Sequence, residues 1–172
     1  MNASELFEGA INWLQENYAS KRFYVERDVV WTVQERLAFM IDAGRLPYRV
    51  FNDFGIVPGK RRSICADLVL VESGNLDVPV ELAAEFKYEP SHSRIDIRPG
   101  KLPVISWGAT RDNLRRVQQF VAEGRAKVGY SVVIDEGGHY RNREPNPGCR
   151  WIDWPLQAGK SGCVSVLWDK IP

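Results

Sequence analysis

Apolar residues recur every three or four positions in two segments of the N-terminal part of the chain, which is the spacing of an amphipathic helix. The first segment covers residues 4–18, where Ser4 can cap the helix. Its apolar positions are Phe7, Ala10, Ile11, Leu14 and Tyr18. The second segment begins near Asp28 and ends before Gly44, and its apolar side chains occupy more than one side. The pattern therefore predicts two helices, the second of them well buried.

After Gly44 the pattern changes to that of β-strands. Apolar and β-branched runs predict strands at Tyr48–Phe54, Ile64–Val71 and Val78–Tyr88. The intervening segments contain Pro58-Gly59 and Ser73-Gly74-Asn75, which are typical of turns. Three strands joined in this way predict a meander.

The rest of the chain alternates between loop, helix and strand. The predicted elements are a loop at 90–100, a short strand or further loop at 104–107, a helix capped by Thr110 or Asp112 and ending at Gly124, a strand at Tyr130–Ile134 and a last strand at Cys163–Trp168. This order predicts an α/β (α+β) fold, in which a mixed central sheet contains the antiparallel three-strand meander and is flanked by helices. With 172 residues, the chain is predicted to be a single domain. Its core would span about 24–135, with an N-terminal helix in 1–23 and a Trp-, Pro- and Gly-rich tail, 136–172, packed on it.

Charge and cysteine content narrow the class of protein. The net charge is only +1, but residues 91–127 hold eight Lys or Arg against three Asp or Glu, which suits either a phosphate-binding segment or a solvated helix face. Three widely spaced cysteines, Cys65, Cys149 and Cys163, argue against a disulfide framework or zinc site and favour a reducing compartment. The sequence shows neither a signal peptide nor an apolar run long enough to span a membrane. We therefore expect a cytoplasmic protein without a membrane partner.

Ionisable residues stand at two strand ends that a hairpin brings together. Asp67 lies near the start of the second predicted strand, and Glu85 and Lys87 lie near the end of the third. Because side chains alternate along a strand, Glu85 and Lys87 share a face, and antiparallel pairing places Asp67 beside them. Two converging carboxylates suit Mg²⁺, and a lysine could orient or help deprotonate an attacking water. The pattern predicts a metal-dependent phosphodiesterase; the alternative is an edge hairpin with a surface ion pair between Glu85 and Lys87.

These residues resemble the motif of the PD-(D/E)XK (restriction-endonuclease-like) nuclease superfamily. Ala66-Asp67 and Glu85-Phe86-Lys87 carry the resemblance over about residues 24–135, with Ala66 where the name-giving pattern has Pro, and the string 84–92 is similar to a bacterial branch of the superfamily. The resemblance implies a restriction-endonuclease-like fold and an endonuclease that hydrolyses nucleic acid, DNA in the first instance, by a Mg²⁺-activated water. It implies Mg²⁺ as cofactor with Mn²⁺ as a substitute, Asp67 and Glu85 as metal ligands, and Lys87 as catalytic lysine.

The superfamily usually adds an acid from the first core helix, and Glu26 and Glu35 are the two candidates. That helix runs antiparallel to the first strand, so its N-terminus lies near the ends that carry the predicted site. Glu35 is about 13 Å further along the helix at 1.5 Å per residue, which favours Glu26 as the assisting catalytic residue. An acid near a helix start also has a purely structural explanation, because it suits the positive end of the helix dipole.

Basic residues after the motif are candidates for binding nucleic acid. They are Arg94, Arg98, Lys101 and Arg115, with Arg111, Arg116 and 60–62 as further candidates. His92 could contact a phosphate or simply be exposed, and Trp151, Trp154 and Trp168 are predicted to pack the tail onto the core. Cleavage of both strands of a duplex would favour a homodimer. The alternatives are a catalytically inert module of the same fold that binds nucleic acid or a protein, and an unrelated α/β enzyme in which Asp67 and Glu85 lie far apart.

Overall fold

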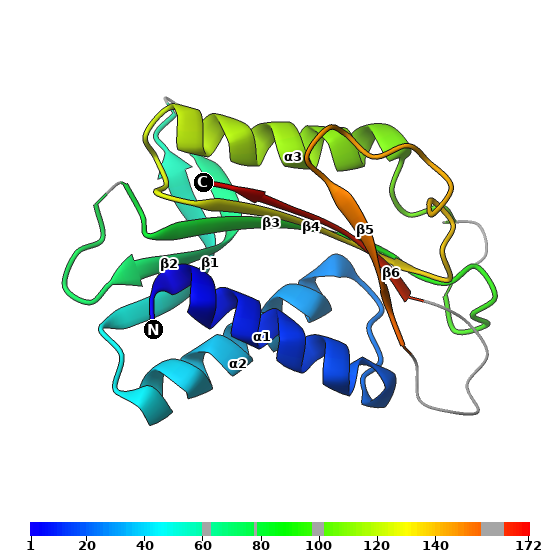
Figure 1. Cartoon of the computed structure of the whole chain (residues 1–172), viewed down its shortest axis with the longest axis horizontal. Coiled ribbons are helices and arrows are strands. Elements are labelled where there is room, and N and C mark those ends of the chain that lie inside the picture. The colour runs from blue at the N-terminus through cyan, green and yellow to red at the C-terminus, as the bar shows by residue number, and fades with distance from the viewer. Residues whose placement is uncertain (60–62, 78, 98–101, 156–163) are drawn as a thin grey trace.

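A six-stranded mixed sheet lies between helices on both faces. The computed structural model describes residues 1–59, 63–77, 79–97, 102–155 and 164–172. In this part of the chain, α1 (Ala3–Asn17) and α2 (Glu26–Gly44) cover one face of the sheet and α3 (Trp107–Ala122) covers the other (Figure 1). The predicted α/β (α+β) class with a mixed, helix-flanked sheet is confirmed. None of the described helices is long and apolar enough to cross a membrane.

Side chains at the helix ends explain where the helices start and stop. α1 is capped by Asn2 and not by the predicted Ser4, because Asn2 and Glu5 form a capping box at its start; the helix continues into a short 3₁₀ turn at Tyr18–Ser20. Before α2, the Asp28 carboxylate accepts hydrogen bonds from the backbone N–H groups of Tyr24 and Val25. These bonds place the first residue of α2 at Glu26, two positions before the predicted start.

The sheet has the strand order β1-β2-β3-β4-β6-β5. The strands are β1 (Tyr48–Val57), β2 (Ile64–Glu72), β3 (Leu82–Glu89), β4 (Gly129–Glu136), β5 (Arg150–Trp154) and β6 (Val164–Ile171). The pairs β1–β2 and β2–β3 are antiparallel, as the meander requires. α3 then crosses over the sheet and returns the chain to β4, which is parallel to β3. This crossover brings α3 over β3, where its side chains reach the predicted site.

The core has two layers, one on each face of the sheet. Alternate side chains of β2 and β3, including Leu68, Leu70, Ala84 and Phe86, pack with α1 and α2. Side chains of the opposite parity, including Val69, Val71 and Ala83, pack with Phe120 of α3. Close packing of α3 depends on Gly129, because a Cβ at that position would clash with Val117. Glu85 and Lys87 have the same parity as Ala83, so they point to the α3 side of the sheet.

Two further sequence predictions need correction. α3 is capped by Ser106, whose side chain accepts a hydrogen bond from the Ala109 N–H, so the helix starts before Thr110 and Asp112. Of the two alternatives at 104–107, the structure has a loop, and α3 already begins at Trp107. The third strand begins at Leu82, later than predicted, although Val80 makes an isolated bridge to Ala126.

The C-terminal segment forms part of the sheet. β6 pairs with β4, and β5 pairs with β6 at the sheet edge; β5 was not predicted from the sequence. Trp154 is buried and Trp168 packs against the core, as expected. Trp151 instead lies near Trp107 of α3, with ring centroids 6.3 Å apart, so its contribution is to the α3 side of the fold.

Candidate active site

The predicted site lies where β2 and β3 separate. The two strands pair only from Leu70↔Leu82 to Leu68↔Ala84; beyond that point β2 continues along β1, and β3 along β4. The next step in this register places Asp67 opposite Glu85. There the Asp67 Oδ2 atom accepts a hydrogen bond from the Phe86 N–H at 2.8 Å, in place of a backbone carbonyl. A carboxylate therefore occupies the opening between the strands.

Glu85 is a fully buried carboxylate without a hydrogen-bond donor. Its exposed fraction is 0%, and neither carboxylate oxygen accepts a hydrogen bond from the residues described. An Nη2 atom of Arg116 lies 3.4 Å from Oε1, but it donates instead to the Cys65 carbonyl. The Asp67 backbone N–H is also near enough to influence Glu85, without meeting hydrogen-bond geometry. Buried carboxylates are normally paired or bound to a metal, so this arrangement calls for an additional positive group.

The surroundings of Glu85 oppose its ionisation. Burial, followed by the negative charge of Asp67, raises the pKa of Glu85 to about 8, and the positive charges of Arg116 and Lys87 only partly offset this. Burial also raises the pKa of Glu26, against a lowering contribution from Lys87. The site thus concentrates more negative charge than its own cations neutralise.

Lys87 and Glu26 form an ion pair at the edge of this cluster. The Lys87 Nζ atom lies 3.0 Å from one Glu26 carboxylate oxygen and 3.1 Å from the other, and it also donates to the Phe86 carbonyl at 2.7 Å. Glu26 reaches this position because it is the first residue of α2. Glu35 instead lines a separate hollow with Lys21 and Trp31. The structure thus brings Glu26, Asp67, Glu85 and Lys87 together, and the lysine pairs with Glu26, whereas the alternative interpretation paired it with Glu85.

α3 supplies two residues, Asn113 and Arg116, that contact Glu85 on the face of the sheet that α3 covers. Asn113 donates from Nδ2 to the Glu85 carbonyl at 3.2 Å and to the Ser131 hydroxyl at 3.0 Å, which fixes the backbone of β3 relative to β4. Arg116, one turn further along α3, faces the Glu85 carboxylate. Asn113 was missed in the sequence, although its spacing of three residues from Arg116 places both on one helix face.

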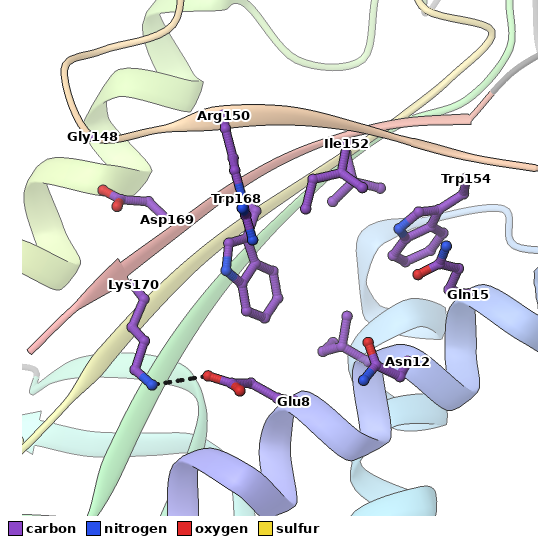
Figure 2. A pocket seen from close by; sticks show the side chains of 12 residues that line it. Glu8, Asn12, Gln15, Gly148, Arg150, Ile152, Trp154, Trp168, Asp169 and Lys170 are labelled. Carbon is purple, nitrogen blue, oxygen red and sulfur yellow. Dashed lines mark hydrogen bonds and ion pairs between the residues drawn. The ribbon is translucent and has the colours of Figure 1, made fainter.

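Two hollows differ in their relation to this cluster. A small one of about 80 Å³ is lined by Glu26 and Asp67 together with Arg27, Val30, Trp31, Asn52 and Asp53. A larger one of about 460 Å³ lies between α1 and the β5–β6 edge, where Glu8 and Lys170 form an ion pair across it (Figure 2). Its walls include Trp154 and Trp168 and none of the four clustered residues. We place the candidate active site beside the smaller hollow, because two of the four clustered residues, Glu26 and Asp67, line it; Glu85 and Lys87 are not among its lining residues.

The donor set suits a hard divalent cation held by few protein ligands. The described part of the chain contains no group of three or more His, Cys, Asp or Glu side chains placed to hold a metal. Mg²⁺, however, is commonly bound by one or two carboxylates and keeps several waters. Asp67 and Glu85 supply such a pair, and the Glu85 oxygens without donors are the observation that favours this fit.

Among the predicted binding residues that the structure describes, Arg94 and Arg115 form ion pairs with acids outside this cluster. Arg94 is engaged in a network with Glu136, Asp96, the Tyr88 hydroxyl and the Phe23 carbonyl, and its side chain is 15% exposed. This arrangement assigns Arg94 a structural role in holding the segment before α2. Arg115 is exposed and pairs with Asp112 on the outer side of α3. Arg98, Lys101 and 60–62 fall outside the described residues.

His92 contacts a second fully buried acid, Glu89. Its Nε2 atom lies 2.7 Å from an oxygen of Glu89, which is fully buried and also accepts hydrogen bonds from the backbone N–H groups of Val104 and Ile105. The ring of His139 lies 4.0 Å away, centroid to centroid. Glu89 was overlooked in the sequence, although it continues the alternation of Glu85 and Lys87 along β3.

No family model, curated protein or solved structure matches the chain. Interpretation of the site therefore depends on its geometry and on the sequence motif.

Proposed function

We propose that the chain is a metal-dependent nuclease that hydrolyses phosphodiester bonds in nucleic acid, with DNA as the expected substrate. The observation that carries the proposal is the buried carboxylate of Glu85 beside Asp67, which has no hydrogen-bond donor among the described residues, with Lys87 two residues further along the same strand. The order α2-β1-β2-β3-α3-β4, with these residues where β2 and β3 separate, supports a restriction-endonuclease-like fold as the resemblance implies.

The proposed chemistry divides among few groups. Asp67 and Glu85 would hold Mg²⁺ or Mn²⁺, which when bound lowers the pKa of water and offsets charge on a phosphate. Lys87 orients the attacking water and stabilises the negative charge that develops on the phosphate oxygens. Glu26 holds the Lys87 ammonium in place through the ion pair at 3.0 Å. Arg116 balances part of the charge on Glu85.

A cleavage assay tests the proposal. Purified protein would be incubated with supercoiled plasmid, linear duplex, single-stranded DNA and RNA in Mg²⁺, Mn²⁺ or EDTA. We expect cleavage that requires the metal and falls by at least a hundredfold in Lys87→Ala and Glu85→Gln. Glu16→Gln, which removes an exposed acid from α1, serves as the matched control and should cleave like the wild type.

Two results would contradict the proposal. Wild-type protein that binds no divalent ion and cuts none of these substrates would remove the catalytic role. Cleavage that persists in folded Lys87→Ala would show that the site lies elsewhere. Nucleic-acid binding without metal dependence or cleavage would favour a catalytically inert module of this fold.

A further inference from the structure

Two large aromatic side chains stand exposed next to the candidate active site. Trp31 on α2 is 50% exposed, and Tyr24, just before α2, is 49% exposed. Large aromatic side chains are usually buried, and exposed ones beside a polar site often contact a ligand. Trp31 lies on the side of α2 that faces away from the core stripe formed by Val29, Val33 and Leu37, and Tyr24 lines a hollow together with it.

Trp31 connects the site to a second hollow. Its ring lines the small hollow that contains Glu26 and Asp67, and it also lines an adjacent hollow of about 340 Å³. The walls of that second hollow include Lys21, Arg22 and Tyr24. Trp31 is therefore a wall that the two hollows share.

Cationic groups accompany the aromatic rings of this region. The Arg27 guanidinium lies 5.9 Å from the Trp31 ring centroid, and the Arg94 guanidinium lies 5.4 Å from that of Tyr24. Arg27 is paired only loosely, at 3.7 Å, with the exposed carboxylate of Asp53, and can exchange it for a phosphate. The nearby Asp28 carboxylate is directed at two backbone N–H groups, so it is engaged in capping α2.

We propose that Lys21, Tyr24, Arg27 and Trp31, here termed the Trp31 surface, bind an unpaired stretch of nucleic acid, with one base stacked on Trp31. The inference rests on the proposed function in taking nucleic acid as the ligand, and it names single-stranded nucleic acid as the substrate class. A base can stack on an aromatic side chain only when it is not paired in a duplex, whereas stacking tolerates any base. Alternating rings and cations are the features that single-strand binding surfaces use.

The spacing agrees with a strand that runs from the site across this surface. Trp31 is five residues beyond Glu26, or about 7.5 Å along α2 at 1.5 Å per residue. Trp31 and Glu26 also line the same hollow, so a strand bound at the site can place a nearby base on Trp31.

Binding measured without cleavage tests the inference. Fluorescence anisotropy in EDTA would follow a labelled oligothymidylate, its abasic analogue and a duplex of equal length. We expect tighter binding of the single strand than of the duplex and at least fivefold weaker binding of the single strand to Trp31→Ala, with Trp31→Phe close to wild type. The abasic analogue should bind weakly to the wild type and be insensitive to Trp31→Ala, because it has no base to stack. Phe39→Ala, which truncates another exposed ring two turns further along α2, is the control and should change nothing.

The outcomes separate this inference from the proposed function. Cleavage that depends on Lys87, combined with single-strand binding that Trp31→Ala leaves unchanged, would overturn the inference and leave the nuclease proposal in place; the exposed rings would then suit a protein partner. Single-strand binding that depends on Trp31, without any cleavage, would support the inference and contradict catalysis. Equal losses of single-strand and duplex binding in Trp31→Ala would also overturn it, because stacking would not be the cause.

Discussion

Replacing Glu85 by Gln should remove a pH-dependent instability of the metal-free protein. Burial and the charge of Asp67 raise the pKa of Glu85 to about 8, from 4.5 in an unfolded chain. Between these two pH values the folded state holds one more proton than the unfolded state. The contribution of Glu85 to stability is therefore fully present below pH 4.5 and is lost as the pH rises towards 8.

The size of this loss of stability follows from the shift in the pKa of Glu85. One proton held only by the folded state changes the free energy of unfolding by about 1.4 kcal/mol per pH unit. Between pH 5 and pH 8 the wild type should lose up to about 4 kcal/mol relative to Glu85→Gln, whose neutral side chain does not titrate. In urea unfolding, this corresponds to a relative shift of the midpoint of about 2 M at a slope of about 2 kcal/mol per molar urea.

Urea titrations followed by tryptophan fluorescence at pH 5, 6, 7 and 8 would measure the difference, with Glu35→Gln as a control for loss of one acid. Divalent metal adds a second test: at pH 8, Mg²⁺ at about a hundred times its dissociation constant should stabilise the wild type by about 2.7 kcal/mol and leave Glu85→Gln unchanged. If the stability curves of wild type and Glu85→Gln run parallel from pH 5 to pH 8, Glu85 is not held in the environment that the structure gives it, and the reasoning is wrong.

Three further predictions concern residues around the site and the core. Arg116→Leu should move metal binding to higher pH, measured by Mn²⁺ titration at several pH values, because it removes a positive charge that lowers the pKa of Glu85; an unchanged pH profile would contradict this. Phe7→Ala should lower the free energy of unfolding by about 3–5 kcal/mol in urea titrations, because its fully buried ring contacts three other aromatic rings; a loss below about 1 kcal/mol would show that the cavity collapses. Arg94→Ala should lower the free energy of unfolding by about 2 kcal/mol in urea titrations, because Arg94 donates hydrogen bonds to the Phe23 carbonyl, the Tyr88 hydroxyl and Glu136; a loss below about 0.5 kcal/mol would contradict the structural role.

Much of the candidate site could be predicted because it depends on local periodicity. Alternation along a strand places Glu85 and Lys87 on one face, and antiparallel pairing with a short turn places Asp67 opposite Glu85. The position of Glu26 followed from the direction of a helix that leads into the first strand. Predicting these positions requires only the direction of the chain and the order of the elements, and both can be inferred from the sequence.

The roles of individual charged residues were much harder to predict. Arg94 and Arg115 were expected to contact nucleic acid, but Arg94 joins a buried network and Arg115 pairs with Asp112. Arg116, adjacent in sequence to Arg115, instead faces Glu85. Long side chains reach partners that are remote in sequence, so their contacts depend on how the elements pack.

Hydrophobic period and strand alternation act over a few residues, and they were enough to predict most of the helices and strands, the faces of those elements and the meeting of Asp67, Glu85 and Lys87. The packing of distant segments was needed to show that Glu85 is buried without a donor among the described residues and that Lys87 pairs with Glu26. It also decided that the tail adds β6 and β5 to the sheet. Burial and ion pairing depend on which distant segments of the chain pack over a residue, and the residues adjacent to it in the sequence do not specify those segments.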